Sequence, residues 1–277
     1  MRKNISSGYK TVDNIVKNWN DANIIVLAER WTDRKKIFSI SLAEIWTERK
    51  TIFSISLAKK LSVNQNISTA YFSMDKPIRD KIISNITELD IKKILDNTLD
   101  KTETIKYQQG FNTLNNSPLY IDETKLNLYE FSSKVRQMVK EKGVEVVFLD
   151  HLQVTDDESI DFKASKSVFH SLRELAKELN ICIFISALLP DREKRSPRVP
   201  CLANLNKYEK LDKQADIILF LFELEYYSIE EERPKIFFKV AKNLSAPNDR
   251  FSMYIEQFYN CVYDIEGYPK SMDNILL

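Results

Sequence analysis

A lysine–threonine pair and a distant aspartate are the residues whose types and placement could bind nucleotide phosphates. Lys50 and Thr51 follow an apolar run at 23–28. At the start of a helix, such a lysine can neutralise the β- and γ-phosphates while the neighbouring hydroxyl holds Mg²⁺. Asp150 ends the apolar run 144–149, and an aspartate there can orient the same ion. Each signal alone is weak, because a basic helix start is often only solvated and such an aspartate often only caps a loop.

The lysine–threonine pair lies in an internal duplication. Residues 27–43 read LAERWTDRKKIFSISLA, and residues 42–58 repeat this as LAEIWTERKTIFSISLA, with a period of 15 residues. A second copy of this length could extend a helix by a little over four turns at about 3.6 residues per turn. We predict that much of 35–61 is helical and that one copy is displaced from the phosphate-binding position.

Scarcity of glycine restricts how a phosphate could be bound. The only glycines among the 277 residues are Gly8, Gly110, Gly143 and Gly267, whereas an average protein contains about 7% glycine. No two of them lie close together, so the sequence contains neither G-x-G-x-x-G nor G-x-x-x-x-G-K-[ST]. Any phosphate site must therefore work without the glycines that let a backbone wrap around a phosphate.

The overall composition excludes several other classes of protein. The 41 Lys and Arg residues balance 40 Asp and Glu residues, which removes the simplest argument for a nucleic-acid-binding chain. Three cysteines without a C-x-x-C pair and two histidines exclude a disulfide scaffold, a cysteine-rich zinc site and a His-rich metal site. Since neither a secretory signal nor an apolar run of about 20 residues is present, we expect a cytoplasmic protein that does not bind a membrane.

Hydrophobic periodicity predicts alternating strands and helices. Strands are expected at 23–28, 67–73, 119–122, 144–149, 181–185, 217–222, 235–241 and 251–256. Amphipathic helices are expected at 128–142, which Gly143 ends, and at 165–179. This alternation is typical of an α/β fold with a mostly parallel sheet. Because no linker-like stretch interrupts it, we expect one domain over 1–277.

Several short segments also match a known family in its own order. They are 5–19, 27–28, 71–75, 118–124, 148–154, 214–217, 225–227 and 241–243. In this order they resemble the C-terminal, RecA-like motor domain of the DnaB-type replicative helicases. The resemblance implies a RecA-like P-loop-NTPase fold, a mostly parallel twisted sheet flanked by helices, in an ATP-dependent DNA helicase family. It also implies that the family's separate N-terminal domain is absent here.

The resemblance assigns roles to particular residues. Asp75 falls at the position of the catalytic glutamate, and Asp150 falls at the Walker B aspartate, where Thr51 would share the Mg²⁺ ion. The positions that would contact the nucleotide are Lys35, Lys50, Thr51 and Lys242. Spacing from the preceding strand favours Lys35 as the phosphate-loop lysine, whereas spacing to the following strand favours Lys50.

The departures from the family pattern all weaken the ATP site. The phosphate-loop glycine is replaced by Arg34 in one copy and Arg49 in the other, and its side chain would occupy the space of the phosphate. An aspartate replaces the catalytic glutamate, and Ala187 or Leu188 stands where a glutamine is expected. Leu244 replaces the arginine finger, a group worth about 10³–10⁵ in rate. The resemblance implies ATP and Mg²⁺ as cofactors, but these losses favour a chain that binds neither and no longer hydrolyses ATP efficiently.

A basic loop is the candidate contact with single-stranded DNA. The resemblance places the loops 156–166 and 191–200 towards DNA, and the first of them is acidic. The second carries Arg192, Lys194, Arg195 and Arg198. Basic side chains there could bind phosphates in a salt-dependent way, although an ordinary solvated loop has the same composition.

Three functions remain open at this point. The first is a degenerate helicase domain that binds single-stranded DNA or replication proteins without hydrolysing ATP. The second is a divergent, active DNA helicase that uses Lys50, Thr51, Asp75 and Asp150 and forms rings. The third is an interaction scaffold that has lost both ligands.

Overall fold

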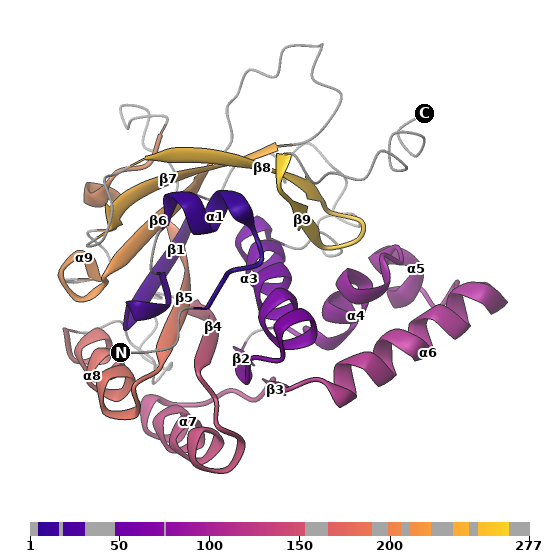
Figure 1. Ribbon diagram of the computed structural model, residues 1–277, viewed down its shortest axis with the longest axis horizontal. Coiled ribbons are helices and arrows are strands. Elements are labelled where there is room, and N and C mark those ends of the chain that lie inside the picture. The colour runs from indigo at the N-terminus through magenta and orange to yellow at the C-terminus, as the bar shows by residue number, and fades with distance from the viewer. Residues whose placement is uncertain are drawn as a thin grey trace.

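A nine-stranded sheet with helices on both faces forms the described part of the chain (Figure 1). The computed structural model describes residues 5–16, 19–30, 48–74, 76–152, 166–189, 199–205, 211–222, 235–243 and 249–265. Within these ranges, no helix is long and apolar enough to cross a membrane.

The sheet is parallel over most of its width. Its strand order is β3–β2–β4–β5–β1–β6–β7–β8–β9. The bounds are β1 Ile24–Arg30, β2 Thr69–Ser73, β3 Leu119–Asp122, β4 Val146–Leu152, β5 Cys182–Leu189, β6 Ile217–Phe222, β7 Lys235–Asn243, β8 Arg250–Glu256 and β9 Cys261–Tyr263. Strands β3 to β6 in this order pair in parallel, and β6 to β9 pair antiparallel. The predicted α/β fold is confirmed, and each predicted strand has a counterpart, whereas β9 was missed.

Helices cover the sheet in two layers. Their bounds are α1 Lys10–Ile15, α3 Arg49–Lys59, α4 Arg79–Thr87, α5 Ile91–Leu95, α6 Lys101–Asn116, α7 Leu128–Lys142, α8 Lys166–Leu179 and α9 Leu211–Gln214. Because side chains alternate between the faces of a strand, neighbours on β2 enter different cores. Tyr71 packs in the core with Phe53 of α3, and Phe72 packs in the other core with Phe131 of α7 and Phe169 of α8. The site described below depends on the first layer, where α3 lies against the sheet (Figure 1).

Local sequence explains the best-predicted helix. At the start of α7, the Asn127 side chain accepts from the backbone of Glu130, whose own side chain bonds back to Asn127. This reciprocal capping satisfies amide groups that a helix start leaves open. Gly143 ends the helix with φ of +62°, a left-handed conformation that glycine adopts at low cost. The predicted helix at 128–142 is therefore confirmed at both ends.

The duplicated segment is described only in its second copy. Helix α3 begins at Arg49, and a π-helical turn at Lys60–Asn64 continues it. The prediction of helix within 35–61 is confirmed from Arg49 onward, and its earlier part lies outside the described residues.

Three helices between β2 and β3 were missed. Helices α4 and α5 are short, and α6 has a weak apolar pattern because it buries only Gly110 and Leu114. The box formed by Asp100 and Glu103 at its start was the signal that could have found it.

Candidate functional site

The carboxyl ends of the central strands meet the start of α3 at a cluster of charged side chains. Thr51 donates its hydroxyl proton to Oδ2 of Asp150, with 2.8 Å between the oxygens. The ammonium nitrogen of Lys50 lies 3.7 Å from Oδ1 of the same aspartate. Three predicted residues are thus brought together across about a hundred positions, and the second copy of the repeat supplies two of them. Asp150 lies within β4 rather than at its end, because the strand continues to Leu152.

Lys50 is held by carboxylates of its own chain. Its side chain is fully buried, and its ammonium group forms ion pairs with Glu48 and with Asp150. Burial lowers the pKa of Lys50, but the Asp150 and Glu48 carboxylates more than offset this, so the net pKa is raised. The ammonium group is therefore charged and already paired.

A second carboxylate occupies the start of α3. Glu29, buried near the end of β1, accepts the backbone N–H of Lys50 at 3.1 Å and lies 3.5 Å from the guanidinium group of Arg49. Burial raises the pKa of Glu29, although Arg49 and Lys50 oppose this shift. A helix start attracts anions because its N–H groups and dipole point outward. Here a carboxylate of the chain occupies that position, which sequence reasoning missed although an acid beside a buried strand was a visible signal.

Tyr71 is a further site residue that the sequence did not reveal. Its hydroxyl group donates to Oδ2 of Asp150 at 3.0 Å from full burial on β2. Burial, and then the charge of Asp150, raise the pKa of Tyr71 well above its usual value. A tyrosine in an apolar strand is normally read as core, so no pattern would have distinguished its polar end.

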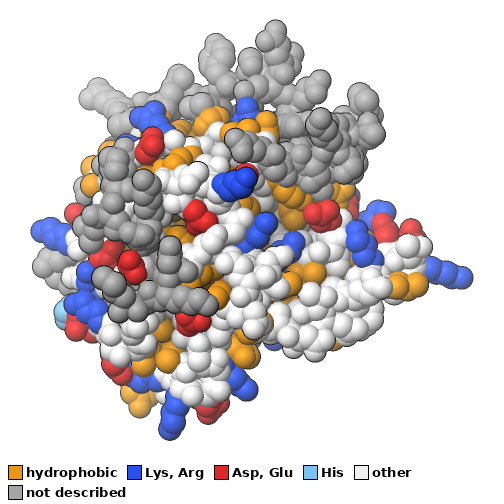
Figure 2. Space-filling model, viewed as in Figure 1, with side chains coloured by type: hydrophobic (Ala, Val, Ile, Leu, Met, Phe, Trp, Pro, Cys, Tyr) orange, Lys and Arg blue, Asp and Glu red, His pale blue; other side chains and the backbone are white. Residues whose placement is uncertain are grey.

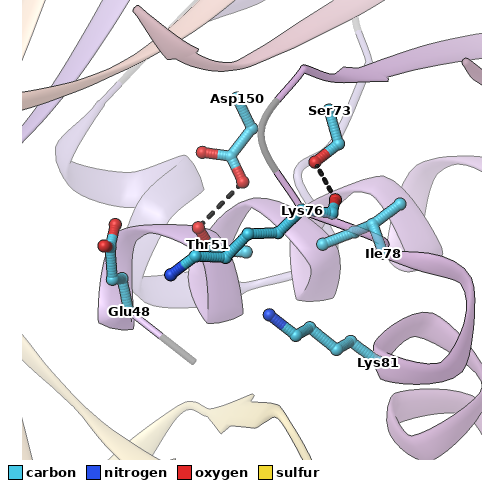
Figure 3. Close-up of a pocket in the computed structure, with 7 residues that line it drawn as sticks. All are labelled: Glu48, Thr51, Ser73, Lys76, Ile78, Lys81 and Asp150. Atoms are coloured by element: carbon cyan, nitrogen blue, oxygen red, sulfur yellow. Dashed lines mark hydrogen bonds between the residues drawn. The ribbon is translucent and has the colours of Figure 1, made fainter. Parts of the chain in front are cut away.

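A small pocket opens in front of Thr51 and Asp150 (Figure 3). Its lining residues are Glu48, Thr51, Ser73, Lys76, Ile78, Lys81 and Asp150. Its volume of about 20 Å³ leaves room for roughly one or two water molecules. The side chains of Lys76 and Lys81 extend into this region in Figure 3. Burial, and then the nearby charge of Lys76, lower the pKa of Lys81.

Thr51 and Asp150 alone provide few ligands for a divalent cation. Mg²⁺ takes oxygen ligands in octahedral geometry and usually binds one or two carboxylates. Thr51 and Asp150 offer such oxygens but bond to each other, and the ammonium group of Lys50 stands beside them. No group of three acidic, histidine or cysteine residues that could hold a metal ion occurs in the described ranges. The predicted Mg²⁺ role of Thr51 and Asp150 thus gains no support from their surroundings.

Lys242 lies at the other ends of the strands, beside the amino end of β6. It pairs with Ile218 near the start of β6, and its ammonium group donates to the carbonyl oxygens of Asp212 at 2.8 Å and Ala215 at 2.5 Å. The structure does not bring it together with Lys50, and its role toward a nucleotide stays a prediction.

Six of the predicted site residues lie outside the described residues. They are Lys35, Asp75, Arg192, Lys194, Arg195 and Arg198. Their roles stay predictions. On the face drawn in Figure 2, acidic and basic side chains of the described residues are interspersed rather than gathered by sign.

Solved structures share this fold. One solved ATPase domain superposes with a TM-score of 0.76 at 22% identity, over 94% of this chain and 91% of that one. A DnaB-like replicative helicase, solved in a study of its interactions with primase, gives a TM-score of 0.75 at 19% identity, over 94% of this chain and 62% of that one. These similarities confirm the RecA-like fold.

Curated replicative DNA helicases are also similar to this chain in sequence. The replicative DNA helicase DnaB of Rickettsia conorii is 27% identical over 238 residues, which are 82% of this chain and 47% of that protein. A probable plasmid replicative DNA helicase of Chlamydia trachomatis is 29% identical over 224 residues, 78% of this chain and 46% of that protein. The chain spans about half the length of these relatives. The DnaB-like helicase C-terminal domain family matches residues 4–262, and the chain therefore belongs to that family.

Proposed function

We propose that this domain keeps the fold of a DnaB-like helicase but does not hydrolyse ATP efficiently, and that it acts by binding single-stranded DNA or replication proteins. One observation carries the first part. Two groups that would hold a nucleotide phosphate are bonded to carboxylates of the chain: the ammonium group of Lys50 to Glu48, and the backbone N–H of Lys50 at the start of α3 to Glu29.

These two carboxylates oppose phosphate binding in two ways. A phosphate must displace them from Lys50 and from the start of α3, and it must approach two negative charges that the fold holds in place. At about 4 Å, like charges repel by roughly 4 kcal/mol in the intermediate dielectric near a protein surface. Arg49 adds a steric obstacle, because its side chain stands where a glycine would leave space and is bound to Glu29.

The DNA-binding part of the proposal has separate support. The curated relatives described above are named as replicative DNA helicases, and the loop at 191–200 carries four basic residues. A basic loop can bind phosphate backbones without a nucleotide site. One solved neighbour, a DnaB-like replicative helicase, interacts with primase, so a replication protein is the other ligand to test.

An active but divergent helicase is the second candidate. It is favoured by the bond between Thr51 and Asp150, because this pair stands where the family's Mg²⁺ ligands would stand. A motor that used this pair would depend on Lys50 and Mg²⁺, and this dependence separates the two candidates.

Titration calorimetry and a turnover assay with Mg²⁺ and ATP test the proposed loss of hydrolysis. We expect wild-type protein and the Lys50→Ala and Lys35→Ala variants to behave alike, with no turnover above background. Replacing both Glu29 and Glu48 with glutamine should create binding that Lys50→Ala then removes, whereas Glu141→Gln on the exposed face of α7 should change nothing. Wild-type turnover that Lys50→Ala abolishes would establish the second candidate instead.

Fluorescence anisotropy with a labelled oligothymidylate tests the DNA ligand. We expect binding that weakens as salt rises and that is lost when Arg192, Lys194, Arg195 and Arg198 are all changed to alanine. Four phosphate contacts on a single strand would give a slope of about −2.8 in log K against log salt. If no oligonucleotide binds at low salt, a replication protein becomes the ligand to seek.

A further inference from the structure

Helix α3 is built from a stretch that occurs twice in the chain. Residues 49–58, which form almost all of α3, read RKTIFSISLA, and residues 34–43 read RKKIFSISLA. The two stretches differ only at Thr51, whose counterpart in the first copy is Lys36. The α3 position, by which we mean the place against the sheet that α3 occupies, is therefore matched by two segments of the same chain.

The packing of α3 uses side chains that both copies supply. The ring of Phe53 is fully buried in the core between α3 and the sheet. The hydroxyl oxygen of Ser54 lies 3.3 Å from that of Ser186 on β5. The 15-residue period makes Phe38 and Ser39 the counterparts of these two residues. Since core packing depends on the shape and volume of the side chains, the first copy can fill the same space.

The end of β1 lies close enough to α3 for the first copy to reach the α3 position. Glu29, near that end, accepts the backbone N–H of Lys50 at 3.1 Å. The counterpart of Lys50 is Lys35, six positions after Glu29, and six extended residues span about 20 Å. The second copy would then form a loop between Ala43 and Lys59, and the entropy of closing a loop depends only weakly on its length.

Two contacts favour the second copy in the α3 position. Thr51 donates to Asp150 at 2.8 Å, whereas Lys36 would bring a further ammonium group to a carboxylate that is already paired with one. The hydroxyl of Ser62 donates to the carbonyl oxygen of Ala58 at 2.7 Å, a bond that a loop inserted at this point would break. The first copy therefore fits less well at a few contacts, while its core side chains are the same.

We propose that the two copies exchange in the α3 position, so that a minor state of the protein carries 34–43 where the structure carries 49–58. The inference does not depend on the proposed function. In the minor state, the ammonium group of Lys36 replaces the hydroxyl of Thr51 beside Asp150. A ligand that contacts this residue binds the two states differently and shifts their populations. The duplication thus acts as a conformational switch between two packings of one sequence.

Disulfide trapping in the full chain tests which copy lies against β5. Ser54→Cys with Ser186→Cys reports the observed state, and Ser39→Cys with Ser186→Cys reports the minor state, because Ser186 is only 2% exposed. We expect both pairs to form under a mild oxidant, the second at least about tenfold more slowly, as for a state populated at about 0.1–10%. Mass spectrometry distinguishes these pairs from the native cysteines. Ser41→Cys with Ser186→Cys is the matched control and should not cross-link, since its counterpart Ser56 bonds elsewhere.

Exchanging the two differing residues should reverse the populations. Lys36→Thr with Thr51→Lys gives the first copy the hydroxyl group and the second copy the extra ammonium group. We expect the pair at Ser39 and Ser186 to become the faster one in this background. Thr113→Lys, on the exposed side of α6, should leave both rates unchanged. If the pair at 54 and 186 forms in wild-type background but the pair at 39 and 186 forms in neither background, the inference is overturned.

Two deletions test the same point without added cysteines. Removing 44–58 leaves only the first copy, and removing 31–45 leaves only the second. We expect both shortened chains to unfold cooperatively in urea. Adding Lys36→Thr to the first should bring its midpoint to that of the second, because the two chains then differ only by Asp33 in place of Glu48. Failure of the chain without 44–58 to fold, even with Lys36→Thr, would show that the first copy cannot fill the α3 position.

Discussion

The amino ends and the carboxyl ends of the parallel strands form two edges of the sheet, which we call the amino edge and the carboxyl edge. Each edge buries an aspartate, but the groups that bond to the two aspartates differ. Asp216 and Asp150 are both 5% exposed. At the amino edge, Asp216 accepts the backbone N–H groups of Asn23 at 2.8 Å and Ile24 at 3.2 Å, and the guanidinium group of Arg173 at 2.7 Å. At the carboxyl edge, side chains from α3 and β2 bond to Asp150 in place of backbone groups.

The difference separates a structural edge from a binding edge. Backbone N–H groups hold the Asp216 carboxylate. At the same edge, the ammonium group of Lys242 likewise donates to two backbone carbonyl oxygens. Side-chain partners can rearrange, and the carboxyl edge also holds the small pocket that Lys76 and Lys81 help to line. Ligands of open parallel sheets bind beyond the carboxyl ends of the strands, and the small pocket lies at that edge.

The largest effect should come from Asp150→Ala. The change leaves Lys50 buried beside a single carboxylate and removes the acceptor of Thr51 and Tyr71. Breaking a buried ion pair by removing one partner typically costs about 3–5 kcal/mol, so urea unfolding should show a loss of that size. Asp150→Asn keeps an acceptor of the same shape and should cost less. A loss under about 1 kcal/mol for the alanine variant, less than one ordinary hydrogen bond, would contradict the pairing.

A smaller loss is expected for Asp216→Ala at the amino edge. Two backbone N–H groups lose their acceptor, but Arg173 is 22% exposed and can turn to water. An unsatisfied buried donor costs about 1–3 kcal/mol. Because Ile24 is buried and Asn23 only partly buried, we expect a total near the top of that range by urea unfolding. A loss as large as that of Asp150→Ala would contradict the difference between the two edges.

Tyr71→Phe should cost still less. The variant keeps the ring in the core and loses one hydrogen bond to the Asp150 carboxylate. A hydrogen bond to a charged group is worth about 1.5–3 kcal/mol, and we expect the lower end because Thr51 and Lys50 still contact the carboxylate. Tyr129→Phe, at a side chain that is 82% exposed, is the matched control and should leave the urea midpoint unchanged. Equal midpoints for both variants would mean that the Tyr71 hydroxyl group contributes nothing to the carboxyl edge.

The same contrast explains what could be predicted from the sequence. Long apolar runs set the strands of the sheet, and caps at Asn127 and Gly143 set α7, so these elements were predictable from local pattern. Lys50, Thr51 and Asp150 were predictable because phosphate chemistry demands their types. The role of Tyr71 was not, because it depends on strand pairing, and for Glu29 the only signal was an acid beside a buried strand, since its role depends on the position of α3. Nor does any local pattern distinguish Lys81 from a solvated lysine of an exposed helix.

The smallest effect concerns the pH dependence that Glu29 adds to stability. Its pKa is raised in the folded state from the ordinary value of 4.5, so between these two values the folded chain binds more protons than the unfolded chain. The free energy of unfolding therefore falls as pH rises through this window, and it stays level above the raised pKa and below 4.5. The slope stays below about 1.4 kcal/mol per pH unit, because one carboxyl group binds at most one proton. Glu29→Gln keeps an acceptor for the N–H of Lys50 and removes the titration, so urea unfolding across this pH range should give a flatter curve for the variant. If the pH dependence of the unfolding free energy were the same for wild type and Glu29→Gln, the pKa of Glu29 would not be raised by folding.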